Sequence, residues 1–291
     1  MFIRKLVLFS SFVLVLMSSD MQASAQAGRP LLKQHPGVVS YTYRKYFEKD
    51  MPGTLDMVKQ NGFTDIEFSS LFGQTAQDIR KMIDERGIRC SSFGVSYEAL
   101  TTKTDEVARN ARILGARFVR VAGFPHSKSG LTLEEARQAV AEFNRVGKIL
   151  KDKYGLTLVY HNHGFEFQPH GKGTLFDYIV QHTNPRYVSL EMDILWVHFP
   201  GQDPVALLKK YGDRFRLMHV KDLKKGVKGN LSGGTDPEND VALGTGQIDI
   251  PAILKAARRS AIQHYYIEDE SSNVETQVPQ SVQYLLSLKE Q

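Results

Sequence analysis

The stretch TLEEARQAVAEFNRVGKILKDKYGLTLVYHNHGFEF, residues 132–167, contains a predicted helix, the predicted strand that follows it and the first polar residues of a candidate site. Within residues 133–154 the apolar side chains recur every three or four positions, which predicts an amphipathic helix. Thr132 stands at the start of this pattern and Gly155 ends it. The short apolar run 156–161 that follows predicts a buried strand, and it leads directly into polar side chains.

The same alternation of a short apolar run and a longer amphipathic stretch recurs along the chain. We predict strands at residues 38–43, 64–68, 88–94, 118–122, 156–161, 187–193, 215–220 and 265–268. We predict helices at residues 54–61, 75–86, 105–114, 133–154, 173–182, 204–211, 250–259 and 279–289. Eight such units in about 250 residues predict an α/β protein, a closed (β/α)₈ TIM barrel. The alternative, an open doubly wound sheet, usually has a glycine-rich phosphate loop after its first strand, where this chain has Tyr41-Thr42-Tyr43-Arg44.

Residues 1–25 have the form of a secretory signal peptide. A basic start at Arg4 and Lys5 precedes a mostly apolar run of about twelve residues, and small residues follow up to Ala25. This run is too short for a bilayer span, which needs about 20 residues. We therefore expect cleavage after Ala25 or Ala27 and no stable membrane insertion afterwards.

The rest of the chain is expected to be an N-terminal extension, residues 26–35, followed by one barrel, residues 36–291. Cys90 is the only cysteine, so no intrachain disulfide forms, and the exported protein fits a periplasmic or secreted location. The formal net charge is +5, and the basic residues are dispersed. The densest basic cluster, residues 221–228, is typical of a solvated loop, so we expect no nucleic-acid partner.

Carboxylates and imidazoles stand at the ends of the later predicted strands, where α/β barrels carry their active sites. They are Glu67, His161 and His163, Glu191 and Asp193, His219 and Lys221, and Glu268. The spacing supports a shared mouth, because 32 residues separate His161 from Asp193 and 26 separate Asp193 from His219, each about one strand–helix unit. A mixed set of imidazoles and carboxylates suits one divalent ion such as Mn²⁺, Co²⁺, Zn²⁺ or Fe²⁺ better than Ca²⁺.

The arrangement resembles the xylose isomerase-like superfamily, which includes sugar epimerases, inosose dehydratases and AP endonuclease 2 barrels. The resemblance covers about residues 36–290, and together its motifs are specific. It is carried by Tyr160-His161-Asn162-His163-Gly164-Phe165-Glu166-Phe167, Met192-Asp193-Ile194-Leu195-Trp196, His219-Val220-Lys221-Asp222, Leu243-Gly244-Thr245-Gly246-Gln247-Ile248-Asp249 and Tyr266-Ile267-Glu268.

The resemblance implies a single metal held by Asp193, His219 and Glu268. The family's ligand on the fifth strand is usually Glu in a Glu-Asn-His segment, and His161 occupies that position here. Either His161 is the fourth ligand, or Glu166 reaches in from the loop, or the site is weaker than usual. We favour His161. The family's usual His at the end of the third strand is absent, because Ser92 to Tyr97 contain none.

The resemblance also implies a role for each of the remaining polar residues. A carboxylate, Glu268 or Glu166, would take a proton next to a polarised carbonyl, and Lys221 would help to stabilise the resulting enediolate. Two further residues, His163 and Trp196, are expected to contact substrate.

Glu67 completes the expected substrate contacts. Two of these residues have a structural alternative: Glu67 as a member of a buried ion pair, and Trp196 as a wall between barrel and helix.

The expected function is a metal-dependent sugar isomerase or epimerase that acts on a small carbohydrate substrate, a non-phosphorylated keto-sugar, since sugar phosphates are cytosolic. One alternative is a 3-keto-glycoside lyase or hydratase that works by β-elimination, and another is a non-catalytic carbohydrate-binding barrel. A DNA-repair endonuclease would need more metal ligands from the second to fourth strands, and residues 88–94 and 118–122 provide no histidine. A homo-oligomer is compatible with the sequence.

Overall fold

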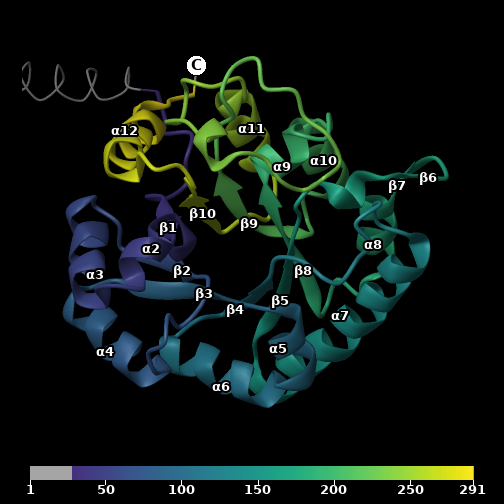
Figure 1. Cartoon of the computed structure of the whole chain (residues 1–291), viewed down its shortest axis with the longest axis horizontal. Coiled ribbons are helices and arrows are strands. Elements are labelled where there is room, and N and C mark those ends of the chain that lie inside the picture. The colour runs from purple at the N-terminus through teal and green to yellow at the C-terminus, as the bar shows by residue number, and fades with distance from the viewer. Residues whose placement is uncertain (1–27, 291) are drawn as a thin grey trace, which may run out of the picture.

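The eight predicted strands form a closed parallel barrel in the computed structural model, which describes residues 28–290 (Figure 1). The predicted signal peptide, residues 1–25, lies outside the described residues. Around the barrel each strand pairs with its neighbour in the order β1, β10, β9, β8, β5, β4, β3, β2, and β1 closes the ring. The strands are β1 (Gly37–Val39), β2 (Asp65–Phe68), β3 (Arg89–Val95), β4 (Phe118–Val121), β5 (Thr157–His161), β8 (Val188–Asp193), β9 (Phe215–Val220) and β10 (His264–Ile267).

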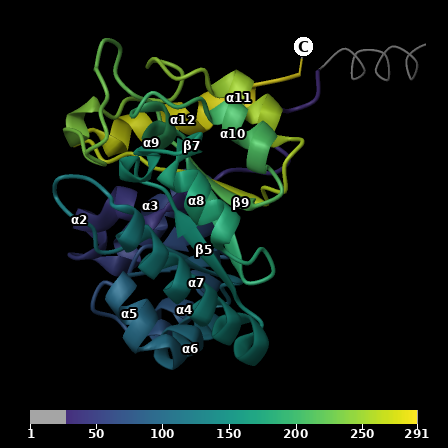
Figure 2. The same ribbon diagram turned by 90° about the vertical axis from the view of Figure 1, so that its right-hand side faces the viewer.

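Helices surround the barrel and cover the outward faces of its strands (Figure 1). Figure 2 shows the N-terminal half of the chain, purple and blue, on one side of the barrel and the C-terminal half, green and yellow, on the other. A short hairpin of β6 (Pro169–His170) and β7 (Gly173–Thr174) lies outside the ring. The helices are α2 (Arg44–Phe47), α3 (Met51–Gln60), α4 (Ala76–Glu85), α5 (Tyr97–Thr102), α6 (Thr104–Leu114), α7 (Leu133–Tyr154), α8 (Leu175–His182), α9 (Ile194–His198), α10 (Pro204–Tyr211), α11 (Ile250–Ala257) and α12 (Val274–Ser287).

The predicted boundaries hold well except at the two ends of the barrel. The first strand stops at Val39, and residues 40–43 turn into a 3₁₀ helix instead of continuing the strand. The last helix begins at Val274, five residues before the predicted start at Pro279, which lies inside the helix. Burial of Val274 and Val278 against the core stabilises this first turn despite the hydrogen bond that the proline removes.

The inside of the barrel is built in layers, because alternate residues of each strand point inward. An apolar layer of Val39, Phe118, Val159, Leu217 and Tyr266 forms its own buried cluster, separate from the core between strands and helices. Two residues beyond four members of this layer, Phe118, Val159, Leu217 and Tyr266, the inward positions carry polar side chains: Arg120, His161, His219 and Glu268. The barrel is therefore closed by apolar side chains below and holds polar groups at its C-terminal mouth.

The chain before the barrel packs against its C-terminal end. The amide of Leu31 donates to the carbonyl of Leu288 at 3.0 Å, and both Leu31 and Leu32 are buried. Among residues 28–290, none of the helices combines the length and apolarity that crossing a bilayer requires.

Helix α7 has the predicted start. The hydroxyl of Thr132 accepts from the amide of Glu135 at 3.3 Å, and the Glu135 carboxylate accepts from the amide of Thr132 at 2.8 Å, which makes a capping box. At the other end Gly155 has φ +72°, a left-handed conformation that glycine adopts without steric cost.

We predict that Thr132→Ala lowers the free energy of unfolding by about 1 kcal/mol, because it leaves an amide at the start of α7 without its acceptor. Urea denaturation followed by circular dichroism measures this loss. Ser129→Ala, in the exposed loop just before the helix, is the control and should change stability by less than about 0.5 kcal/mol. Equal effects of the two substitutions would contradict the role of the capping box.

Candidate metal centre

A cavity of about 480 Å³ opens at the C-terminal ends of the barrel strands. The loop between β9 and α11 contributes Gly233 to Thr235, Pro237 and Asp240 to one wall. The other lining residues are Tyr41, Ser69, Val95, Ser96, Arg120, Ala122, His161, His163, Trp196, His219, Glu268 and Glu270. Five of the predicted site residues, His161, His163, Trp196, His219 and Glu268, therefore share one cavity.

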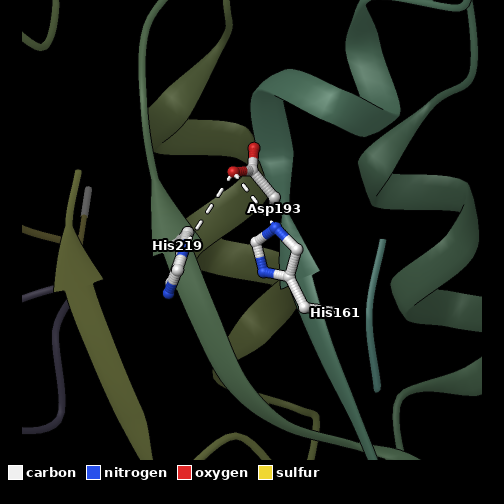
Figure 3. Close-up of side chains that lie close together, drawn as sticks. All are labelled: His161, Asp193 and His219. Atoms are coloured by element: carbon white, nitrogen blue, oxygen red, sulfur yellow. Dashed lines mark ion pairs between the residues drawn. The ribbon is translucent and has the colours of Figure 1, made fainter. Parts of the chain in front are cut away.

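Three predicted ligands converge on the floor of this cavity (Figure 3). Asp193 Oδ2 lies 3.9 Å from His161 Nε2 and 3.9 Å from His219 Nδ1. Two ligand atoms that each lie about 2.1 Å from one cation can be up to about 4.2 Å apart, so these spacings suit a shared ion. The strand register creates the contact, because Asp193 on β8 stands beside His219 on β9.

Asp193 uses its two carboxylate oxygens differently. Oδ1 accepts from the amide of Trp196 at 3.0 Å and caps helix α9, while Oδ2 is buried with no hydrogen-bond partner among the described residues. Asn162 fixes the backbone beneath it: the Asp193 amide donates to Asn162 Oδ1 at 3.1 Å, and the Asn162 side chain donates to the Asp193 carbonyl at 3.3 Å. A capping role and a ligand role are thus compatible in one side chain.

Glu268, the fourth predicted ligand, stands beside this set: of the four, only His161, Asp193 and His219 bring ligand atoms within 4.8 Å of one another. Its Oε2 lies 2.5 Å from His219 Nδ1, yet Nδ1 makes no aligned hydrogen bond. His219 Nδ1 and Asp193 Oδ2 are both buried without a hydrogen-bond partner among the described residues, and each offers a lone pair, which is what a cation site requires. The residues present therefore fit a divalent metal ion.

The far nitrogen of each histidine faces a carboxylate deeper in the barrel. His161 Nδ1 lies 3.0 Å from Glu191 Oε2, and His219 Nε2 lies 3.0 Å from Glu67 Oε1 and 3.3 Å from Glu191 Oε1. Arg120 forms ion pairs with both carboxylates: its Nε lies 2.8 Å from Glu67 Oε1 and 3.7 Å from Glu191 Oε2. Burial by itself would raise the pKa of Glu67, but the charges of Arg120 and His219 outweigh it and lower the pKa to about 2.

The electrostatics of the converging atoms favour positive charge between them. Burial raises the pKa of Asp193 to about 7, and the charge of Glu268 adds to this effect while Lys221 opposes it. Burial by itself would lower the pKa of His219, but the charges of Glu191 and Glu268 outweigh it and raise the pKa well above its ordinary value. The cavity floor thus stabilises a positive charge on His219 Nδ1, whether a proton or a metal ion carries it.

Lys221 lies beside the metal centre and is completely buried. Its Nζ donates to Glu270 Oε1 at 2.7 Å and lies 3.5 Å from both Glu268 Oε1 and Asp240 Oδ2. It also lies 5.6 Å from the centre of the Trp196 ring, which forms part of the cavity wall. Burial by itself would lower the pKa of Lys221, but the three carboxylates outweigh it and raise the pKa well above its ordinary value.

Four predicted site residues are not part of the cavity lining: Asp193 lies beneath its floor, Lys221 lies beside it, and Glu166 and Glu67 lie deeper in the protein. Glu166 is fully buried in its own turn, where Tyr160 donates its hydroxyl and the amides of His163 and Gly164 donate at 2.9 and 2.7 Å. Because its oxygens are occupied there, its position favours a structural role over the roles of base or metal ligand. Glu67 likewise lies below the cavity floor, and its position favours orienting His219 over contacting substrate.

His163 and Trp196 line the cavity side by side, with ring centres 5.9 Å apart. Burial lowers the pKa of His163 to about 4, so its ring is neutral near pH 7. His163 Nδ1 is buried without a hydrogen-bond partner among residues 28–290. A neutral polar nitrogen next to an indole face is suited to a sugar, which offers hydroxyl groups and apolar C–H surfaces.

Sequence reasoning gave no role to four residues that the structure brings to the site. Glu191 could have been found, because it stands two positions before Asp193 on one strand and therefore faces the same side. Arg120 was also detectable, as a charged residue inside the apolar run 118–122. Glu270 and Asp240 meet at Lys221 through loop folding, for which the sequence pattern contains no signal.

Comparisons with known proteins identify a curated relative and solved structures that are similar to this chain. The curated relative inosose dehydratase 2 of Bacillus cereus is 28% identical over 187 residues, 57% of this chain and 61% of the relative, so the chain spans less than two thirds of that protein. A solved sugar phosphate isomerase/epimerase from Parabacteroides distasonis is 27% identical with a TM-score of 0.69, over 91% of this chain and 96% of that one. A solved IolI protein with a bound zinc atom shares the fold, with a TM-score of 0.68, 15% identity, and coverage of 87% and 95%.

The family model described as xylose isomerase-like TIM barrel matches residues 55–288, from the third helix to the last. This range contains the whole metal centre. The match, the closed eight-stranded ring and the shared cavity agree, and they confirm both the predicted fold and the predicted resemblance. The chain belongs to the xylose isomerase-like TIM barrel family.

Proposed function

We propose that this protein is a divalent-metal-dependent enzyme that eliminates a β-leaving group, such as water, from an uncharged keto-sugar or keto-polyol. The observation that carries the proposal is the convergence of Asp193 Oδ2, His161 Nε2 and His219 Nδ1 at the floor of one cavity, with Glu268 Oε2 next to His219 Nδ1. When bound there, the metal ion would polarise a substrate carbonyl as a Lewis acid. The chain itself then has to move one proton.

Glu268 is the side chain placed to move that proton. Its Oε2 lies next to His219 Nδ1, its Oε1 lies 3.5 Å from Lys221 Nζ, and the side chain lines the cavity. In the proposed step Oε1 takes the proton from the carbon next to the carbonyl, and Lys221 stabilises the negative charge that develops on the substrate. Glu268 then gives the same proton to the oxygen on the neighbouring carbon, the C–O bond breaks, and water leaves.

The charge of the cavity supports an uncharged substrate. Asp240, Glu268 and Glu270 all line it, and the two nearby cations already face carboxylates: Arg120 pairs with Glu67, and Lys221 pairs with Glu270. A phosphate group would need free cations or backbone amides. The proposal therefore concerns a non-phosphorylated substrate, although one structural neighbour is described as a sugar phosphate isomerase/epimerase.

The curated relatives support elimination over isomerisation, since they are described as inosose dehydratases. Isomerisation or epimerisation, our expectation from the sequence, is the second candidate, supported by the description of the 27% identical solved structure. Both reactions start with the same proton transfer to Glu268 and differ only in where the proton goes next. A non-catalytic carbohydrate-binding barrel would show no turnover by either route.

We further propose that the protein acts outside the cytosol. Support comes from the sequence of residues 1–25, with its basic start, short apolar run and small residues before Ala25. An uncharged substrate is consistent with this location, because phosphorylated sugars are retained in the cytosol.

We predict that the purified protein holds one divalent ion per chain, and that His161→Ala and His219→Ala each lose most of it, because each removes one of the three ligand atoms that converge there. Glu166→Ala should keep its metal, since Glu166 is held by its own turn. Elemental analysis measures the metal content directly. Metal loss in the Glu166 variant with retention in the His161 variant would reverse the assignment of the ligand on β5.

We predict that the metal-loaded protein converts a keto-cyclitol or a 3-keto-glycoside to a product that lacks the leaving group, and leaves free ketose phosphates unchanged. Mass spectrometry separates elimination, which changes the mass, from epimerisation, which does not. Glu268→Gln should lower kcat by about 10² or more, because the amide cannot accept the proton. A product of unchanged mass would favour the epimerase, and no product with any keto-sugar would favour the binding barrel.

We predict that expression with the complete N-terminus in a bacterial host delivers the protein to the periplasm with a new N-terminus at Gln26 or Gly28. N-terminal sequencing of the periplasmic fraction measures this. Replacing Arg4 and Lys5 by Glu should retain the uncleaved chain in the cytosol. An uncleaved parent chain in the cytosol would contradict the proposed location.

A further inference from the structure

We propose that Glu191 and Glu67, joined by Arg120, form a buried acidic clamp that sets which nitrogen of His161 and of His219 is free to bind the metal. This inference rests on the metal centre of the proposed function but concerns positioning residues, which touch neither the metal nor substrate. From the sequence we expected Glu67 to contact substrate or to join a buried ion pair, and we gave Glu191 no role.

The two histidines must present opposite nitrogens to the cavity. His161 turns Nε2 toward Asp193, whereas His219 turns Nδ1 toward Asp193 and Glu268. A nitrogen that carries a hydrogen cannot bind a metal, so His161 has to hold its proton on Nδ1 and metal-bound His219 has to hold its proton on Nε2. The surroundings must therefore impose a different tautomer at each ring.

The acidic clamp supplies this bias. Glu191 Oε2 lies 3.0 Å from His161 Nδ1, and Glu67 Oε1 lies 3.0 Å from His219 Nε2. Each contact places a carboxylate oxygen at hydrogen-bond distance from a ring nitrogen, and this geometry favours the tautomer whose N–H donates to that oxygen. The opposite nitrogen of each ring is then left with its lone pair directed into the cavity.

Glu191 is the central member, because it lies next to both rings, with a hydrogen bond to His161 and a close contact without an aligned hydrogen bond to His219. Its Oε2 faces His161, and its Oε1 lies 3.3 Å from His219 Nε2. The strand register fixes this position: Glu191 on β8 stands directly beside His161 on β5.

Arg120 offsets the repulsion between the two carboxylates of the acidic clamp. Two buried carboxylates that share one imidazole would repel each other, and the guanidinium stands between them, 2.8 Å from Glu67 and 3.7 Å from Glu191. Space for it comes from Gly94 on β3, where an added Cβ would lie 2.7 Å from Arg120 Nη2. The apolar layer beneath is thus capped by an ion cluster whose charges are mutually compensated.

The test compares Glu191→Gln and Glu67→Gln by titration with Mn²⁺ and Zn²⁺. At position 191 an amide can accept with one atom only, so it must direct its NH₂ group at one of the two rings, and we expect metal affinity to fall about 10–100-fold. At position 67 the amide oxygen can still accept from His219, so we expect a smaller loss.

Long-range ¹H–¹⁵N NMR of the histidine rings gives a readout that a merely structural role would not change. In the metal-free parent His161 should be in the Nδ1–H form, and Glu191→Gln should shift it toward Nε2–H or a mixture. Glu191→Met, which removes both acceptors, is the second variant if Glu191→Gln is poorly folded.

The chain offers a matched control at the opposite end of the barrel. His264 Nδ1 lies 2.7 Å from Asp65 Oδ2, a buried carboxylate–imidazole pair near the start of β2 and β10. Asp65→Asn should alter the His264 signal and leave metal affinity within about twofold of the parent.

Unchanged affinity and an unchanged His161 tautomer in folded Glu191 variants would overturn this inference alone. Failure of the parent itself to bind either ion would instead overturn the proposed function. Three results together support the clamp: loss of metal affinity in Glu191→Gln, a shifted His161 tautomer in that variant, and unchanged metal affinity in the Asp65→Asn control.

Discussion

Burial of like charges inside a closed barrel is the constraint on which the rest of the site depends. Glu67, Glu191, Asp193 and Glu268 are all almost completely excluded from water, and isolated buried carboxylates are costly. The chain compensates the lower pair with Arg120 and the histidine rings. The upper pair faces His219 and Lys221, but Lys221 is shared with Asp240 and Glu270, so carboxylates outnumber cations there and the proposed divalent ion would reduce their mutual repulsion.

The layered interior explains how a barrel can carry this cluster at all. Apolar residues such as Phe118 and Leu217 fill the lower part of the barrel and provide the hydrophobic stabilisation, so the charged layer above them does not have to contribute. Each polar residue also pairs with one from a different strand, as with Glu191 and His161. Ring closure thereby turns six distant segments of sequence into one connected network of charges and hydrogen bonds.

Much of the fold was readable from the sequence, because helix and strand periods alternate cleanly and the glycine at residue 155 marks a real helix end. Predicting Asp193 and His219 succeeded for a related reason: parallel strands bring their ends together. The strand ends do not reveal which polar residues face the cavity. Glu166 illustrates this, since Gly164 at φ +102° turns the chain back and the carboxylate closes its own loop.

Glu67 and Glu191 were among the strand-end carboxylates, but their role was missed because strand ends alone do not show which residues lie below the cavity, while inward positions continue down the barrel every second residue. Glu191 stands one inward step below Asp193, and Arg120 one step above Phe118. The substitution of His161 for the family's usual glutamate then acquires a physical meaning. A neutral imidazole can bind the metal only if its hydrogen is on the nitrogen that faces away from the metal. Glu191 lies beside that nitrogen of His161 and favours the hydrogen there. Two imidazoles with two carboxylates also form a softer ligand set than carboxylates alone, which favours zinc, iron or cobalt over magnesium or calcium.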